Sequence, residues 1–133
     1  MKTFSPLRLR RITTLLVLVA ATALGGGCTQ VMVDQDTRGE YKLGELQVFA
    51  DRDFAKVYAA AKSGMKDVKL FQTQDDRKVI EAELRGRDAV DTMVIVKIKE
   101  VGPNRTSVKI RYGVIKPDLT LAQKLYQAIE KQL

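Results

Sequence analysis

The side chains that carry most enzyme and metal chemistry are sparse in this 133-residue chain, which has one cysteine, Cys28, and no histidine. Zinc, haem and thiolate sites rely on histidine and cysteine ligands, and Ser–His–Asp or Cys–His catalytic units need a histidine. We therefore expect no metal site and no cofactor. Cys28 has no second thiol to pair with, so an intrachain disulfide is excluded as well.

Acidic pairs are the first remaining candidates for catalysis. A glycosidase needs two carboxyl groups that face each other across a cleft, and the chain offers Glu81 with Glu83 and Asp75 with Asp76. We expect neither pair to lie beside a pocket. Hydrolysis is accordingly the third alternative for function, and the chain is not expected to be an enzyme or to have catalytic residues.

Ser107 could also form a Ser–Lys pair with Lys109 on its own expected strand or with Lys99 on the adjacent one. Such a pair works as a nucleophile only where water is excluded. Neighbours on an exposed face of a sheet do not exclude water, and we reject this pair as a catalytic unit.

A basic strip is the one feature that supports a binding hypothesis. The turn Gly102-Pro103-Asn104 joins two expected strands and would place Lys97 opposite Lys109, Ile95 opposite Arg111 and Lys99 opposite Ser107. Like charges directly opposite each other cost about 0.2–1 kcal/mol per pair. Four side chains would form a face able to bind phosphate-bearing lipid headgroups, lipopolysaccharide or an acidic partner, namely Lys97, Lys99, Lys109 and Arg111.

Two other interpretations of this face stay open. Glu81 and Glu83 on the adjacent expected strand would neutralise the strip and leave an ordinary solvated surface. Met93 and Ile95 share the face, and exposed apolar side chains on a sheet can mark a surface for a partner protein or a second copy. The oligomeric state is left open.

The N-terminal segment has the three parts of a secretory signal. Arg8, Arg10 and Arg11 precede an apolar run of 13 residues, Ile12 to Leu24, and small residues follow it. A helix needs roughly 20 apolar residues to cross a bilayer, so the run is short for a permanent anchor and suits a signal peptide. An uncleaved leader, which would leave an inner-membrane anchor, is the alternative.

The sequence Leu24-Gly25-Gly26-Gly27-Cys28 resembles the lipobox of bacterial lipoproteins. The resemblance implies cleavage between Gly27 and Cys28 and acylation of Cys28 with long fatty acids such as palmitate. The usual leucine lies three residues before the cysteine, whereas here it lies four before and Gly25 takes its place. Because Thr29 rather than aspartate follows Cys28, the resemblance further implies a periplasm-facing protein on the outer rather than the inner membrane.

These features divide the chain into a lipoprotein signal peptide (1–27), a tether (28–40) and one folded domain (41–133). The formal charge of +7 includes four basic residues and no acidic residue before Cys28, so the exported part carries +3. That is an ordinary surface charge, and we expect no nucleic-acid partner. The expected partners are a membrane, through acylated Cys28, and an envelope protein or an anionic lipid.

Hydrophobic periodicity predicts the elements of the domain. Period-two alternation indicates five strands, and spacings of three and four indicate a helix after Asp51, ending at Gly64 in a left-handed conformation, and a last helix capped by Asp118. The expected strands cover 41–50, 68–73, 78–85, 90–101 and 105–114, with a turn at 74–77 and with Ile80 pointing inward. Asp51 is the expected N-cap of the first helix. We predict an α+β fold in which one antiparallel sheet carries both helices on one face, in the order β-α-β-β-β-β-α.

The domain also resembles an uncharacterised family of small bacterial lipoproteins. The resemblance is carried by Gly44-Glu45-Leu46, Lys56-Val57-Tyr58 and the run from Asp118 to Ile129. It implies a lipobox and one compact α+β domain, with no assigned activity. We expect an envelope lipoprotein that acts as a non-catalytic structural or interaction module; the alternative is a small binding protein for an anionic lipid or glycan.

Overall fold

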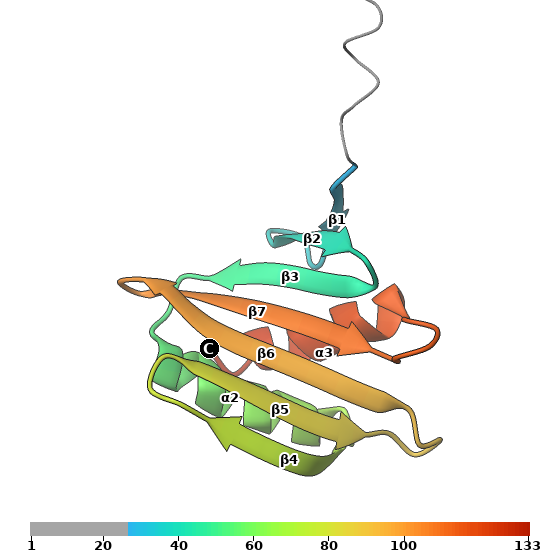
Figure 1. The fold of residues 1–133 in the computed structure, drawn as a ribbon. Coiled ribbons are helices and arrows are strands. Elements are labelled where there is room, and N and C mark those ends of the chain that lie inside the picture. Colours follow the sequence, from blue (N-terminus) through green and yellow to red (C-terminus); the bar gives the residue numbers. More distant parts are fainter. Residues whose placement is uncertain (1–26) are drawn as a thin grey trace, which may run out of the picture.

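The computed structural model describes residues 27–133. The basic and apolar parts of the predicted signal peptide lie outside the described residues. In the described part, seven strands form one sheet in which every neighbouring pair is antiparallel, and two helices lie on one face of it (Figure 1). The prediction of an α+β fold with a single antiparallel sheet and two helices on one face is therefore confirmed.

The strands follow the chain as β1 (Thr29–Met32), β2 (Arg38–Lys42), β3 (Glu45–Ala50), β4 (Phe71–Arg77), β5 (Glu81–Arg87), β6 (Met93–Gly102) and β7 (Arg105–Tyr112). Helix α2 (Phe54–Asp67) follows β3, and α3 (Leu119–Glu130) ends the fold. The order across the sheet is β1-β2-β3-β7-β6-β5-β4. The sheet thus has two more strands than predicted, and the chain order differs at its N-terminal end.

The two extra strands occupy most of the segment predicted as a tether. Val33 is buried and Val31 packs against the core, while Gly39 lies so close to β3 that an added Cβ would be 3.0 Å from a Leu46 methyl carbon. Backbone pairing of β1 with β2 and of β2 with β3 supplies the rest of the stabilisation, and it leaves no hydrophobic periodicity in such short strands. The tether prediction for 28–40 is wrong for this reason.

The edge strand β4 explains a second error. Residues 74–77 were predicted as a turn, yet they belong to β4 and pair with β5, and the turn follows at 78–80. Nearly all of β4 is exposed, so polar side chains on both faces hide its alternation. Ile80, which was predicted to point inward, is 48% exposed in that turn.

The core lies between the sheet and the helices. The alternating side chains of β3, β5, β6 and β7 point towards the apolar stripes of α2 and α3, as the periodicity predicts. The fully buried large side chains include Leu46, Leu84, Ile98, Ile110, Leu125, Tyr126 and Ile129. One face of the sheet is thereby covered, and the other face is bare.

Helix ends match the sequence only in part. Asp118 caps α3 as predicted, because its carboxylate accepts a hydrogen bond of 3.0 Å from the Leu121 amide. The N-cap of α2 is Asp53 rather than Asp51, and it makes no side-chain cap bond. Gly64 lies inside α2 instead of ending it, and the left-handed residue after the helix is Lys69, with φ of 61°.

The loop between β5 and β6 is held by one carboxylate. Asp88 Oδ1 accepts hydrogen bonds from the Val90 and Thr92 amides at 3.0 and 2.8 Å, and Oδ2 accepts one from the Tyr112 hydroxyl at 3.0 Å. The Thr92 amide does most to hold the pKa of Asp88 below its ordinary 3.8. Burial, reinforced by Asp88, raises the pKa of Tyr112 to about 12.

The Asp88 carboxylate makes the stability of the fold depend on pH. The pKa of Asp88 is lower in the folded than in the unfolded chain, so its contribution is complete above about pH 4 and is lost as the pH falls through the folded pKa. We expect urea unfolding to show a larger loss of stability between pH 6 and pH 3 in wild type than in Asp88→Asn. Asp36→Asn, at an exposed turn, should keep the wild-type slope; an equal slope in Asp88→Asn would contradict the assignment.

Candidate binding groove on the open sheet face

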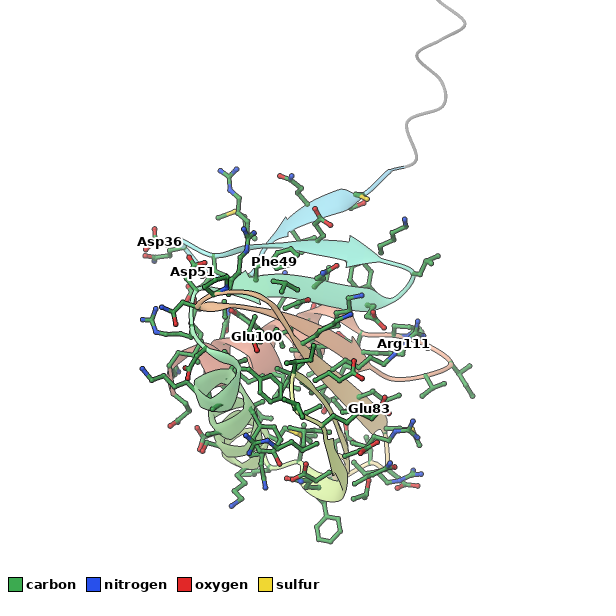
Figure 2. The ribbon with its side chains drawn as sticks, turned by 60° about the vertical axis from the view of Figure 1, so that its left-hand side comes forward. Asp36, Phe49, Asp51, Glu83, Glu100 and Arg111 are labelled. Carbon is green, nitrogen blue, oxygen red and sulfur yellow. The ribbon has the colours of Figure 1, made fainter. Side chains whose placement is uncertain are left out.

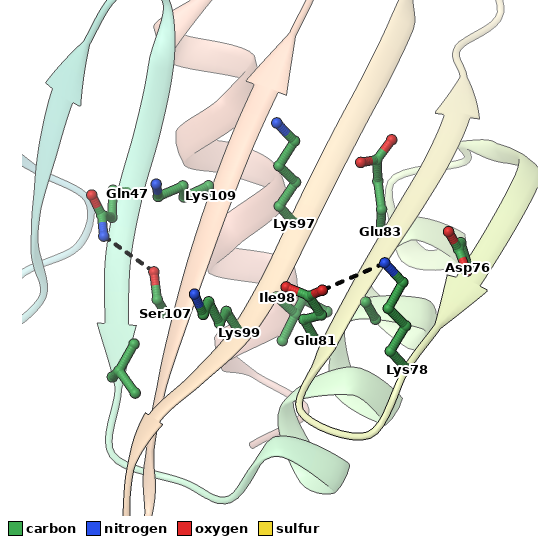
Figure 3. Close-up of a pocket in the computed structure, with 12 residues that line it drawn as sticks. Gln47, Asp76, Lys78, Glu81, Glu83, Lys97, Ile98, Lys99, Ser107 and Lys109 are labelled. Atoms are coloured by element: carbon green, nitrogen blue, oxygen red, sulfur yellow. Dashed lines mark hydrogen bonds and ion pairs between the residues drawn. The ribbon is translucent and has the colours of Figure 1, made fainter.

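The predicted basic strip lies on the face of the sheet that the helices leave bare; Figure 2 labels its Arg111, and Figure 3 labels its three lysines. In β6 and β7, Lys97 is opposite Lys109, Lys99 is opposite Ser107, and Ile95 is opposite Arg111. This register is the one predicted from the Gly102-Pro103-Asn104 turn. The like-charged pair is therefore a real feature of adjacent strands, with the Cβ atoms of such pairs about 5 Å apart.

Three of the four predicted residues line a groove of about 320 Å³ in this face (Figure 3). Ser107 points into the groove and is only 4% exposed, because the longer side chains around it cover it. Its hydroxyl accepts a hydrogen bond of 3.1 Å from the Gln47 amide. The full lining is Gln47, Asp76, Lys78, Glu81, Ala82, Glu83, Lys97, Ile98, Lys99, Val101, Ser107 and Lys109.

The groove has walls of opposite charge. Lysines from β6 and β7 form one wall, and Asp76, Glu81 and Glu83 from β4 and β5 form the other. The Glu83 carboxylate accepts hydrogen bonds of 2.6 Å from the Arg85 guanidinium, and the Glu81 carboxylate lies 3.6 Å from the Lys78 ammonium. Within residues 27–133, no carboxylate lies within ion-pair distance of Lys97, Lys99 or Lys109. Two acids of the acidic wall, Glu81 and Glu83, are thus paired to cations, and the basic wall is left available.

Arg111 does not belong to the groove. Its guanidinium donates a hydrogen bond of 2.6 Å to the Leu43 carbonyl in the turn between β2 and β3. Met93 and Ile95, at the same end of β6, are half-buried rather than fully exposed. The predicted strip therefore separates into a lysine cluster in the groove and an arginine that holds a turn.

The acids on the groove wall correct one expectation. Glu81 and Glu83 were not expected beside a pocket, yet both line the groove. They project from the same strand on the same wall, whereas a glycosidase needs carboxyl groups on opposite sides of the bond that breaks. The arrangement does not match that reaction, and the serine hydroxyl beside them is bonded to an amide rather than to a lysine.

A second polar cluster joins α2 to the edge strand β4. The Tyr58 hydroxyl donates to both carboxylate oxygens of Asp75 at 2.6–2.7 Å, and the Lys62 ammonium lies 3.0 Å from the same group. Arg77 lies over the Tyr58 ring, which stacks with Phe54. The hydrogen bond from Tyr58 is the main cause that lowers the pKa of Asp75. This cluster fastens an exposed strand to the helix layer, and the aromatic pair is part of the packing.

Residues 27–133 contain neither a metal-ligand cluster nor a helix suited to crossing a membrane. These residues contain no group of three or more histidine, cysteine or acidic side chains arranged to hold a metal ion. Neither helix in this part of the chain has both the length and the hydrophobicity that a membrane crossing needs.

Gln47 and Lys78 are groove residues that the sequence did not single out. Gln47 enters because β3 pairs with β7 and places it opposite Lys109, and Lys78 enters because its turn follows β4. A sequence-based signal existed for Gln47, which alternation predicted on the wet face of its strand. The missing information was which strand would be the neighbour of β7.

The comparisons with known proteins identify a family. A family model with the description "Protein of unknown function (DUF3568)" matches residues 11–132. The chain belongs to this family, in agreement with the resemblance to an uncharacterised family. No curated protein sequence matches the chain.

Proposed function

We propose that this member of the DUF3568 family is an exported lipoprotein that is held on the outer membrane by acylated Cys28 and binds an anionic ligand in the groove between β3 and β5. The observation that carries the proposal is a buried serine surrounded by lysines that have no acidic partner within the described residues. The protein has no catalytic role in this account and acts as a periplasm-facing binding module.

The position of Cys28 supports an anchor at the start of the domain. Its thiol is exposed and free, and β1 begins at the next residue. Each buried acyl methylene contributes roughly 0.8 kcal/mol, and two or more chains hold a protein stably where a single chain does not. An acylated Cys28 would place the sheet directly at the membrane surface, without the stalk that the sequence predicted.

The lysine cluster supports an anionic ligand. Opposed lysines destabilise a sheet by about 0.2–1 kcal/mol relative to neutral pairs. A bound phosphate or carboxylate group would offset that repulsion and accept hydrogen bonds from several ammonium groups and from Ser107. The volume of about 320 Å³ is at the small end of ligand sites, which suits a headgroup-sized or sugar-sized ligand.

A charge reversal in the groove tests this function. We expect Lys97→Glu/Lys109→Glu to weaken the binding of inorganic pyrophosphate at least tenfold, because two charged donors are replaced by repelling groups. Isothermal titration of the purified full protein in detergent measures the affinity. Lys124→Glu, an exposed lysine on the helix side, is the matched control and should bind like wild type.

The results also separate the alternative functions. Pyrophosphate binding that is equal in the groove variant and the control would contradict the groove, and so would an absence of binding in wild type. In that case, a defined protein cross-linked to the sheet face in intact envelopes would favour the alternative of a structural or interaction module. Lys109→Gln adds an independent readout. Because it removes the repulsion between Lys97 and Lys109, it should raise the free energy of unfolding by about 0.2–1 kcal/mol, and it should weaken ligand binding.

A further inference from the structure

Cys28 lies at one particular end of the sheet. Strand β1 runs antiparallel to β2, with Thr29 opposite Tyr41, so the chain enters beside the turn Leu43-Gly44 that follows β2. Any membrane anchor on residues 1–28 therefore attaches to the end of the sheet that carries this turn.

Four large apolar side chains are at least 76% exposed at the same end, and Val114 beside them is 49% exposed. The register places the start of β3 beside the end of β7, the start of β6 beside both β7 and the end of β5, and the start of β4 beside the end of β5. The loops at these positions form the right-hand end of the sheet in Figure 1, where those after β7 and β5 project furthest. They carry Leu43 (82% exposed), Ile115 (99%), Val90 (80%) and Phe71 (76%), here called the tip row.

The degree of apolar exposure distinguishes this end from the opposite one. At the opposite end of the described sheet, Val79 is 90% exposed, and Met32, Phe49, Ile80 and Val101 are 42–53% exposed. Exposed lysines lie one or two residues from three of the four tips, namely Lys42, Lys69 and Lys116. The exposed acids Asp67 and Asp118 lie at the same end, and Asp91 beside Val90 is paired with Arg87 at 3.1 Å. The turns at the opposite end carry exposed acids and exposed bases side by side, including Asp34, Asp36, Asp51, Asp53, Glu100, Arg38, Arg52, Lys78 and Arg105. Apolar tips flanked by basic side chains are the composition that binds an anionic bilayer surface.

We propose that the tip row inserts into the headgroup region of the bilayer, so that the sheet stands on its end on the membrane. The proposal rests on the membrane attachment proposed above and adds an orientation to it. Apolar tips enter the interface, the neighbouring lysines meet lipid phosphates, and the turns at the other end point away. Ile115 and Val90 lie on the two loops that project furthest and would insert most deeply.

This orientation sets the position of the groove. Ser107 lies five residues before Tyr112, where β7 ends at the tip row, and a strand advances about 3.4 Å per residue. The centre of the groove is therefore about 17 Å from the membrane-proximal end of its strand. The groove opens sideways above the bilayer, and its ligand comes from the aqueous space or from another envelope layer rather than from the anchoring headgroups.

The chain contains no tryptophan, so a single introduced tryptophan reports on one site. Ile115→Trp and Val90→Trp place the reporter in the tip row. Val79→Trp is the matched control, because Val79 is 90% exposed in the turn between β4 and β5 at the opposite end. The full acylated proteins are reconstituted in vesicles of phosphatidylethanolamine and phosphatidylglycerol with brominated acyl chains.

We expect the bromine to quench tryptophan fluorescence at 115 and 90 at least twofold and to leave the Val79→Trp signal unchanged. Vesicle flotation is measured on the same samples. Two results would overturn the orientation and leave the anchor intact. In the first, the protein floats while tryptophan fluorescence at 115 and 90 is unquenched; in the second, it floats while that fluorescence is quenched only as much as at 79. Protein that does not float would overturn both the anchor and the orientation.

Discussion

Gly64→Val should lower the free energy of unfolding by about 3 kcal/mol, the upper part of the range for an overpacked core. Helix α2 crosses α3 at Gly64, where an added Cβ would lie 2.8 Å from the Ile129 nitrogen and 2.9 Å from its Cα. Backbone atoms cannot move aside as a flexible side chain can, so the helices must separate. Urea unfolding followed by circular dichroism measures the loss.

Ser63→Val is the matched control for this substitution. Ser63 is the preceding residue of α2 and is exposed, so valine there carries the same helix propensity without meeting α3. We expect a change below about 1 kcal/mol. Similar losses in Ser63→Val and Gly64→Val would mean that propensity rather than helix contact explains the effect, and the close crossing would lose its support.

Cys28→Ala should lose almost all incorporation of labelled palmitate, because it removes the only thiol in the chain. The thiol is exposed and precedes β1, so the domain should remain folded in the variant. Fractionation of cells grown with labelled palmitate measures both attachment and acylation. Thr29→Ser keeps the thiol and changes its neighbour, and it should label like wild type; equal labelling of Cys28→Ala would remove lipidation from the account.

The regular parts of this fold could be predicted because their side chains alternate between core and solvent. Strands β3, β5, β6 and β7 and both helices bury one face each, and the pairing of Lys97 with Lys109 followed from a single short turn. The edges could not be predicted in this way. Strands β1, β2 and β4 gain stability from backbone hydrogen bonds, which leave little trace in the side-chain pattern.

Gly64 shows the same limit for a single residue. A glycine near the end of a hydrophobic stripe predicts a helix terminus, because glycine adopts left-handed conformations at low cost. Here the glycine serves the contact with Ile129, and Lys69 adopts the left-handed conformation instead. A contact between residues 65 positions apart in the chain is set by packing, so the local sequence gives no sign of it.

The binding groove was only half predictable for a similar reason. The lysines share one face of two consecutive strands, and the hairpin brings them together. The acidic wall and Gln47 come from strands whose neighbours depend on the topology of the whole sheet. The sequence therefore predicted a charged strip, whereas the structure shows a groove with two differently charged walls.

The most direct test of the account is the intact mass of the native protein purified from cell envelopes. We predict a chain that begins at Cys28, lacks residues 1–27 and carries acyl groups on that residue. A full-length polypeptide that begins at Met1, is recovered from the cytosol and carries no acyl group would contradict the account.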